Sequence, residues 1–114
     1  MSAHNRLLGA RGEAAAASWY EANGYEVVDR NWRCREGEID LVVRNGRVFV
    51  FCEVKSRTSI RFGAPAEAIT RDKQARLRRL AARWLEDSPV RAMEIRFDVA
   101  AVLDGSVEVL QGAF

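Results

Sequence analysis

The chain has 114 residues, 48% hydrophobic and 30% charged, with a formal net charge of +2. This length is typical of one domain, so we expect a single domain over residues 1–114 with one hydrophobic core. No apolar run reaches the roughly 18 residues of a membrane span, and no signal-peptide core stands near the start, so we expect no membrane contact and a cytoplasmic location.

The first half of the chain predicts one helix and three strands. Residues 4–22 are alanine-rich and are followed by Asn23-Gly24, which is typical of a helix that ends at glycine. Strands are predicted at residues 25–35, 38–44 and 47–56. Cys34 and Cys52 form no CxxC pair, so we expect two reduced thiols and no cysteine zinc site.

The second half predicts another helix and two more strands. A loop at residues 57–65 leads to a helix at residues 66–87, in which apolar residues from Ile69 onward keep helical spacing. A strand with apolar residues at 93, 95, 97 and 99 then turns at Asp104-Gly105 into a last strand, SVEVL. The fold class is therefore α/β, with a mixed sheet of about five strands flanked by helices in the order α-β-β-β-α-β-β.

The Asn-Gly pair at residues 45–46 predicts a two-residue hairpin turn between the second and third strands. That turn places Glu38 directly opposite Glu53, and Asp40 opposite Phe51. Like charges directly opposite each other destabilise a sheet. The pairing therefore needs an explanation beyond solubility.

Side chains alternate between the two faces of a strand, so four charged residues share one face. They are Glu38, Asp40, Glu53 and Lys55. The opposite face is apolar and predicts the core; it carries Ile39, Leu41, Val43, Val48, Val50, Cys52 and Val54. A solvated strand face is the simpler explanation of the charges. Against it, Phe49 and Phe51 share the charged face, so we expect that face to be partly covered.

Two carboxylates at close range become favourable when a divalent cation lies between them. Mg²⁺ prefers oxygen ligands, commonly one or two carboxylates with water and substrate phosphate. A lysine on the same face could neutralise a phosphate or activate water. The carboxylates and the lysine together are the groups that metal-assisted phosphodiester hydrolysis requires. Glu13 is the one acid in a stripe of small and apolar residues on the first helix. It is either a capping or snorkelling acid or a further carboxylate directed at this site.

The order of these residues, a helix glutamate, an Asp and then E-x-K after a hairpin, resembles the PD-(D/E)xK nuclease superfamily. More closely, GYEVVDRNWRCREGEIDLV, VFVFCEVKSR, FGAPAEAI and RFDVAAV resemble the bacterial YraN family of predicted endonucleases. The resemblance extends from about Gly9 to Val102. It implies a restriction-endonuclease-like fold and a divalent metal, Mg²⁺ or Mn²⁺.

The resemblance also implies roles for individual residues. Asp40, Glu53 and the Val54 carbonyl would bind the metal, and Lys55 would position or activate the attacking water. Glu13 would match the first-helix acid of resolvase-like members. Glu38 matches the GEID motif of the closer family, as a further candidate ligand. Ile39 stands where the superfamily has its eponymous proline, a departure common in the resolvase-like branch.

Basic residues predict a polyanionic partner, which the resemblance implies is DNA. Six of the thirteen residues 71–83 are basic. Lys73 and Arg76 lie at the margin of the helix's apolar face and could reach phosphates near the metal, as could Arg57 and Arg61 in the preceding loop. A solvated basic helix face is the alternative for each of the helix residues.

The function expected from these features is metal-dependent hydrolysis of DNA phosphodiester bonds, with branched or otherwise non-B DNA as a candidate substrate. The small domain is compatible with a symmetric homodimer. Two alternatives stay open, because a fold does not fix a function. One is a nucleic-acid-binding module with an unused nuclease-like site, and the other is an interaction protein that recruits a larger enzyme.

Overall fold

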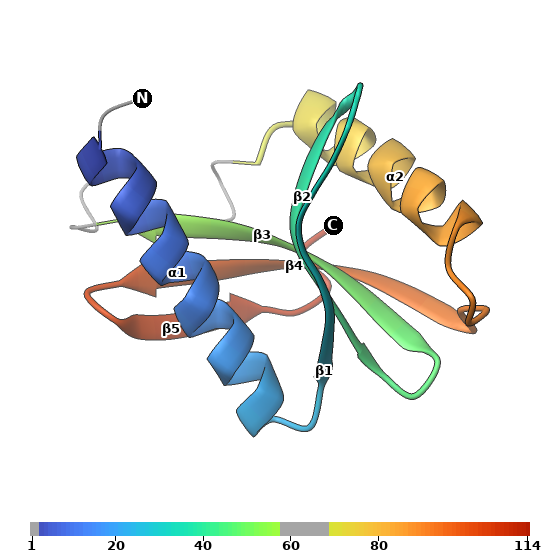
Figure 1. The fold of residues 1–114 in the computed structure, drawn as a ribbon, viewed down its shortest axis with the longest axis horizontal. Coiled ribbons are helices and arrows are strands. Elements are labelled where there is room, and N and C mark those ends of the chain that lie inside the picture. The colour runs from blue at the N-terminus through green and yellow to red at the C-terminus, as the bar shows by residue number, and fades with distance from the viewer. Residues whose placement is uncertain (1–2, 58–68) are drawn as a thin grey trace.

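The computed structural model describes residues 3–57 and 69–114, which form two helices and one five-stranded sheet (Figure 1). In chain order the elements are α1 (Ala3–Ala22), β1 (Glu26–Cys34), β2 (Gly37–Asn45), β3 (Val48–Arg57), α2 (Arg71–Glu86), β4 (Glu94–Leu103) and β5 (Ser106–Leu110). The sheet order is β1-β2-β3-β4-β5, with β3 and β4 parallel and the other neighbours antiparallel. The predicted α/β architecture and element order are confirmed.

The two helices cover opposite faces of the sheet. α1 packs Ala16, Ala17 and Tyr20 against one cluster, whose strand residues are Leu41, Val43, Val50, Cys52 and Ala100. α2 packs Leu77, Leu80 and Ala81 against the other, with Ile39, Val42, Phe49, Phe51 and Phe97. Alternate residues of β3 therefore point into different cores, as the pleat of a strand requires.

Covering of the phenylalanine face is confirmed, since Phe49 and Phe51 are only 1% and 2% exposed. The assignment of the core to the opposite face was incomplete, because each face carries a core. Ile39 was placed wrongly with Leu41: it packs in the α2 cluster. β2 turns away from β3 at this end of the sheet, which carries Ile39 toward α2 (Figure 1).

The hairpin between β2 and β3 differs from the prediction by its turn. Asn45 pairs with Val48, so Gly46 and Arg47 form the loop. Gly46 has a φ of +61°, which suits the first position of a type II′ turn, where glycine is favoured. The Arg47 carbonyl also accepts a hydrogen bond of 2.9 Å from the Met93 amide at the approach to β4.

This turn shifts the pairing register by two residues. Phe51 lies opposite Val42 rather than Asp40, and Glu38 lies opposite Arg33 of β1. The predicted direct pairing of Glu38 with Glu53 is therefore wrong. A register shift of two residues by itself moves no side chain to the other face, because the strand period is two. Ile39 is the exception, since the bend of β2 brings it into the α2 cluster.

The second helix starts later than predicted. α2 begins at Arg71, and the Thr70 side chain caps it by accepting a hydrogen bond of 3.2 Å from the Lys73 amide. Threonine stabilises the N-cap because its oxygen satisfies an amide that has no partner within the helix. Ile69, predicted to be helical, precedes the cap. Residues 58–68, including Arg61 and most of the predicted loop, lie outside the described residues, as does the Arg57 side chain.

Candidate active site

The candidate site lies where β2 and β3 part. Their pairing runs from Asn45 and Val48 to Leu41 and Cys52. Beyond that point β2 continues along β1, and β3 continues along β4 (Figure 1). Residues that follow the last pair on each strand therefore flank the opening of a fork.

Asp40 and Glu53 are these flanking residues. Asp40 is half-buried, and its Oδ2 accepts a hydrogen bond of 2.9 Å from the Val54 amide. This bond spans the fork and fixes the Asp40 carboxylate next to the start of the E-x-K segment. Glu53 is only 8% exposed. The sheet thus brings two carboxylates together in a place that water reaches poorly.

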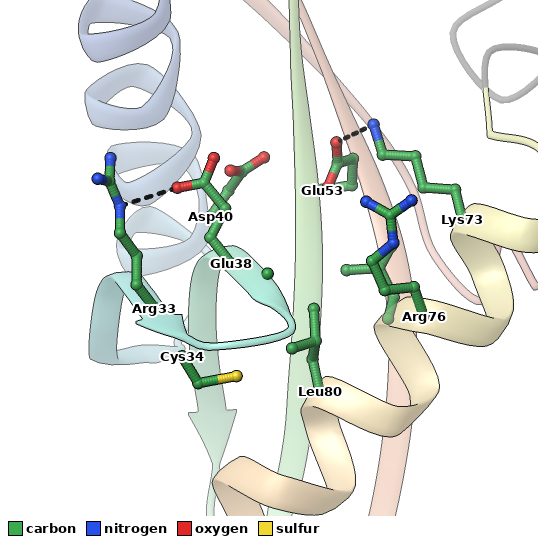
Figure 2. Close-up of a pocket in the computed structure, with 10 residues that line it drawn as sticks. Arg33, Cys34, Glu38, Asp40, Glu53, Lys73, Arg76 and Leu80 are labelled. Carbon is green, nitrogen blue, oxygen red and sulfur yellow. Dashed lines mark hydrogen bonds and ion pairs between the residues drawn. The ribbon is translucent and has the colours of Figure 1, made fainter.

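Two lysines converge on the Glu53 carboxylate. Lys73 Nζ of α2 lies 2.8 Å from Glu53 Oε1, and Lys55 Nζ lies 3.5 Å from the same oxygen. Figure 2 shows the Lys73 contact, with α2 beside the fork. The N-cap at Thr70 sets the start of α2, so it also sets where Lys73 points. Two cations from different elements therefore reach one acid.

The pKa values of three side chains in the site are shifted, in different directions. Burial, then the nearby charge of Glu53, raises the pKa of Asp40 to about 7; Glu13 and Glu38 add to this, and the Val54 amide opposes it. Burial, then the nearby positive charge of Lys73, lowers the pKa of Lys55. Burial also opposes protonation of Lys73, but its contact with the Glu53 carboxylate outweighs that effect and raises the pKa of Lys73. Perturbed groups gathered in a cleft are typical of functional sites.

Asp40 and Glu53 line two cavities at once. The smaller, of about 350 Å³, is lined by residues of α1, β2 and β3, among them Gly9, Glu13, Val54, Lys55 and Ser56. The larger, of about 530 Å³, lies between the β1–β2 hairpin and α2, and Lys73 and Arg76 are on its α2 wall (Figure 2). The two carboxylates stand at the junction of these spaces.

The structure brings most of the predicted site residues together. Glu13 lines the smaller cavity together with Lys55, and Lys73 and Arg76 line the larger. Glu38 also lines the larger cavity, but its half-exposed carboxylate forms a 3.1 Å ion pair with Arg33.

The hairpin wall of the larger cavity was not predicted from the sequence. Arg33, Cys34 and Gly37 line it, opposite Leu77 and Leu80 of α2. The one available signal was the Glu36-Gly37 turn, because Gly37 adopts a φ of +151° where the hairpin approaches α2. A Cβ there would lie 3.4 Å from Leu80 Cδ1, which is an ordinary contact. The backbone conformation, rather than space, therefore favours glycine.

Close approach of α1 requires a second glycine. A Cβ at Gly12 would lie 3.0 Å from Ser56 Cβ and would overlap the Ser56 hydroxyl. Gly12 therefore lets α1 lie directly against the end of β3, which brings Glu13 of the next position to the site.

Within the described part of the chain, no helix is long and apolar enough to cross a membrane.

Known proteins resemble this chain over most of its length. A UPF0102 protein of Beutenbergia cavernae is 60% identical over 96 residues, which cover 84% of this chain and 81% of that protein. A UPF0102 protein of Frankia casuarinae is 53% identical over 112 residues, covering 94% and 95%. One of Rhodococcus jostii is 50% identical over 103 residues, covering 90% and 87%.

The family described as "Uncharacterised protein family UPF0102" matches residues 12–102. This range includes Glu13 and the whole fork between β2 and β3. It is the YraN-like group that the sequence analysis singled out. The chain belongs to the UPF0102 family.

Proposed function

We propose that the protein is a divalent-metal-dependent nuclease of the PD-(D/E)xK type that hydrolyses phosphodiester bonds in DNA. The observation that carries this proposal is the pair of carboxylates at the fork, Asp40 and Glu53, with Lys55 beside them. A pKa of about 7 for Asp40 means that its negative charge is disfavoured where it stands. A cation bound between the two acids would remove that penalty.

The donor set fits Mg²⁺ or Mn²⁺. Among residues 3–57 and 69–114, no three His, Cys, Asp or Glu side chains group to hold a metal. Hard cations need no such group, since Mg²⁺ commonly takes one or two carboxylates and keeps several waters. Asp40 and Glu53 would supply the carboxylates and Val54 its carbonyl oxygen. We leave Glu38 out of this set, because it lies two residues beyond Asp40, opposite Arg33 of β1, and its carboxylate is half exposed at the surface.

Each side chain of the site then has a distinct role. When bound, the metal would polarise the scissile phosphate and stabilise the charge that develops on it. Lys55, whose pKa is lowered, is suited to position the attacking water and to accept its proton. Glu13 lines the same cavity and would orient that water. Lys73 and Arg76 would bind substrate phosphates from the α2 wall.

A binding module with an unused site is the second candidate, and one observation favours it. Lys55 and Lys73 both contact Glu53, so the protein itself partly neutralises this acid. In that case Asp40→Asn would leave every activity unchanged. A cytoplasmic location and a symmetric homodimer stay predictions under either function.

The test is cleavage of labelled single-stranded, duplex, flapped and four-way-junction DNA with Mg²⁺ or Mn²⁺. Wild type is compared with Glu53→Gln, which keeps the shape of the side chain, and with Glu108→Gln, a matched change at an exposed position of β5. We expect metal-dependent cleavage that Glu53→Gln abolishes and Glu108→Gln preserves. DNA binding without cleavage by wild type, with either metal, would favour the binding module.

A further inference from the structure

The larger cavity is a cleft with two walls from different parts of the chain. One wall is the β1–β2 hairpin, with Arg33 and Cys34, and the other is α2, with Arg76 and Leu80 (Figure 2). The walls come close to each other at Gly37, where an added Cβ would lie 3.5 Å from Arg76 Cδ. The same cleft is lined by the carboxylates Asp40 and Glu53.

The chemistry of the cleft changes from its rim to its floor. Asp40 and Glu53 form the floor, and Glu53 is only 8% exposed. Basic side chains stand on both walls, Arg33 on the hairpin and Arg76 on α2. A polyanion could therefore be held from both sides while one of its phosphates reaches a cation that the acids would hold.

Arg33 is free to exchange partners. Its side chain is 76% exposed, and its ion pair with Glu38 spans 3.1 Å at the surface. Exposed pairs of this kind contribute little to stability. A guanidinium forms its strongest contacts with bidentate oxyanions such as phosphate. Arg33 can therefore move from Glu38 to a phosphate at little cost to the fold.

We propose that this cleft takes one unpaired strand of DNA, so that the substrate is a single-stranded segment rather than a continuous duplex. A volume of about 530 Å³ is in the range of sites for small molecules, suited to one nucleotide unit rather than two paired strands. Single-strand sites combine a basic groove along one backbone with side chains on which bases stack; the cleft supplies the basic walls, and Leu77 and Leu80 supply apolar surface. This inference rests on the proposed nuclease function and names its substrate class.

Cys34 provides a native reporter of the cleft. Its side chain is half-buried and lines the cavity, whereas Cys52 is 1% exposed, and burial raises the pKa of its thiol to about 12. A bulky maleimide should thus alkylate Cys34 and leave Cys52 as an internal control. The rate is measured with Ca²⁺ present, with an oligothymidine or a closed-end duplex at concentrations that anisotropy confirms as saturating. A gel confirms that the DNA stays intact.

We expect the oligothymidine to slow alkylation of Cys34 at least several-fold and the closed-end duplex to leave it unchanged. Arg33→Ala should weaken binding of the oligothymidine and reduce the slope of log affinity against log salt by about 0.7, because one phosphate fewer is neutralised. Arg30→Ala, an exposed arginine of the same strand that lines neither cavity, should change neither quantity.

Two results would overturn the inference, and only the second would also overturn the proposed nuclease function. If the duplex protects Cys34 as well as the oligothymidine does, or if bound oligothymidine does not protect it, the single-strand cleft is wrong. Cleavage that depends on Glu53 would then still support the nuclease. If no DNA of any form binds, both the cleft and the nuclease proposal fail.

Discussion

Two carboxylates of the same sheet, Asp98 of β4 and Asp40 of β2, differ in the partners that balance their charge. Asp98 is fully buried and accepts hydrogen bonds from Tyr20 Oη at 2.6 Å, Arg96 Nε at 2.8 Å and the Gly112 amide at 3.0 Å. Arg96 also donates to Tyr25 Oη at 3.1 Å. This acid joins α1, β4 and the residues after β5, with its charge balanced by a guanidinium.

Asp40 accepts a backbone hydrogen bond but faces a second acid. Burial and Glu53 raise its pKa to about 7, while hydrogen bonding to Asp98 raises the pKa of Arg96. A buried charge needs a partner. Asp98 has partners within the fold that balance its charge, whereas Asp40 has one backbone amide and a neighbouring acid. The first is a structural acid, and the second has the properties of a functional one.

Removal of Asp98 should have the largest effect on stability. Asp98→Ala would take this acceptor from the fully buried Tyr20 hydroxyl and from the partly buried Arg96 guanidinium. Breaking a buried pair from one side costs about 3–5 kcal/mol. We expect a loss of this size in the free energy of unfolding, measured by urea titration. A loss below about 1 kcal/mol would show that the network is not structural and would remove the contrast with Asp40.

Asp40→Asn should stabilise the protein, and the gain should depend on pH. The folded pKa of about 7 lies above the ordinary 3.8, so the stability from this group is complete below about pH 4 and is lost as the pH rises to about 7. The variant avoids this loss. Its advantage over wild type should grow by up to about 4 kcal/mol from pH 4 to pH 7, because the pKa of Asp40 is about three units above its ordinary value and one pKa unit corresponds to about 1.4 kcal/mol.

Urea unfolding at several pH values checks this, with Glu108→Gln at an exposed position as the matched control. Cleavage should be lost in the same variant that gains stability. An equal gain at pH 4 and pH 8 would contradict the assignment of a raised pKa to Asp40.

The sequence predicted the fold and the faces better than the contacts. Glycine turns and alternation located the strands, and the two-residue error in the hairpin register by itself moved no side chain to the other face, because strands repeat every two residues. That is why Asp40, Glu53 and Lys55 were found together. The turn residues and the alternation along each strand are enough to predict which face these three side chains share. Only the bend of β2, which alternation does not show, moved Ile39 to the α2 cluster.

The partners of Asp98 and the hairpin wall of the cleft were not predictable in this way. Tyr20, Arg96 and Gly112 meet at Asp98 only because α1, β4 and the residues after β5 pack together. Arg33 lines the cleft because the hairpin bends toward α2. Both depend on tertiary packing between segments far apart in the chain, and spacing along one strand carries no information on it.

Lys73→Met should separate metal binding from DNA binding. Lys73 Nζ lies 2.8 Å from Glu53 Oε1 and contributes positive charge where a cation would bind. Its removal should therefore raise the affinity for Mn²⁺ several-fold while weakening DNA binding. Lys55→Met should instead abolish cleavage with little change in DNA binding. Calorimetry and anisotropy measure the two affinities, and equal behaviour of the two variants would contradict the separate roles.

Ser56→Ala should have the smallest effect. The Ser56 hydroxyl is buried at the contact with Gly12 and has no hydrogen-bond partner among the described residues. An unpaired buried polar group costs about 1–3 kcal/mol. We expect a gain of up to about 1 kcal/mol in the free energy of unfolding, with the exposed Ser106→Ala as control. A clear loss of stability would mean that the hydroxyl has a partner.

Calorimetric titration of wild type and Glu53→Gln with Mn²⁺ tests the central claim most directly. We expect one site per chain whose affinity rises about tenfold per pH unit below pH 7, as a proton on Asp40 competes with the metal. Glu53→Gln should lose this binding while keeping the wild-type fold by circular dichroism. Absence of binding by wild type at pH 8, or equal binding by both proteins, would contradict a metal centre at the fork.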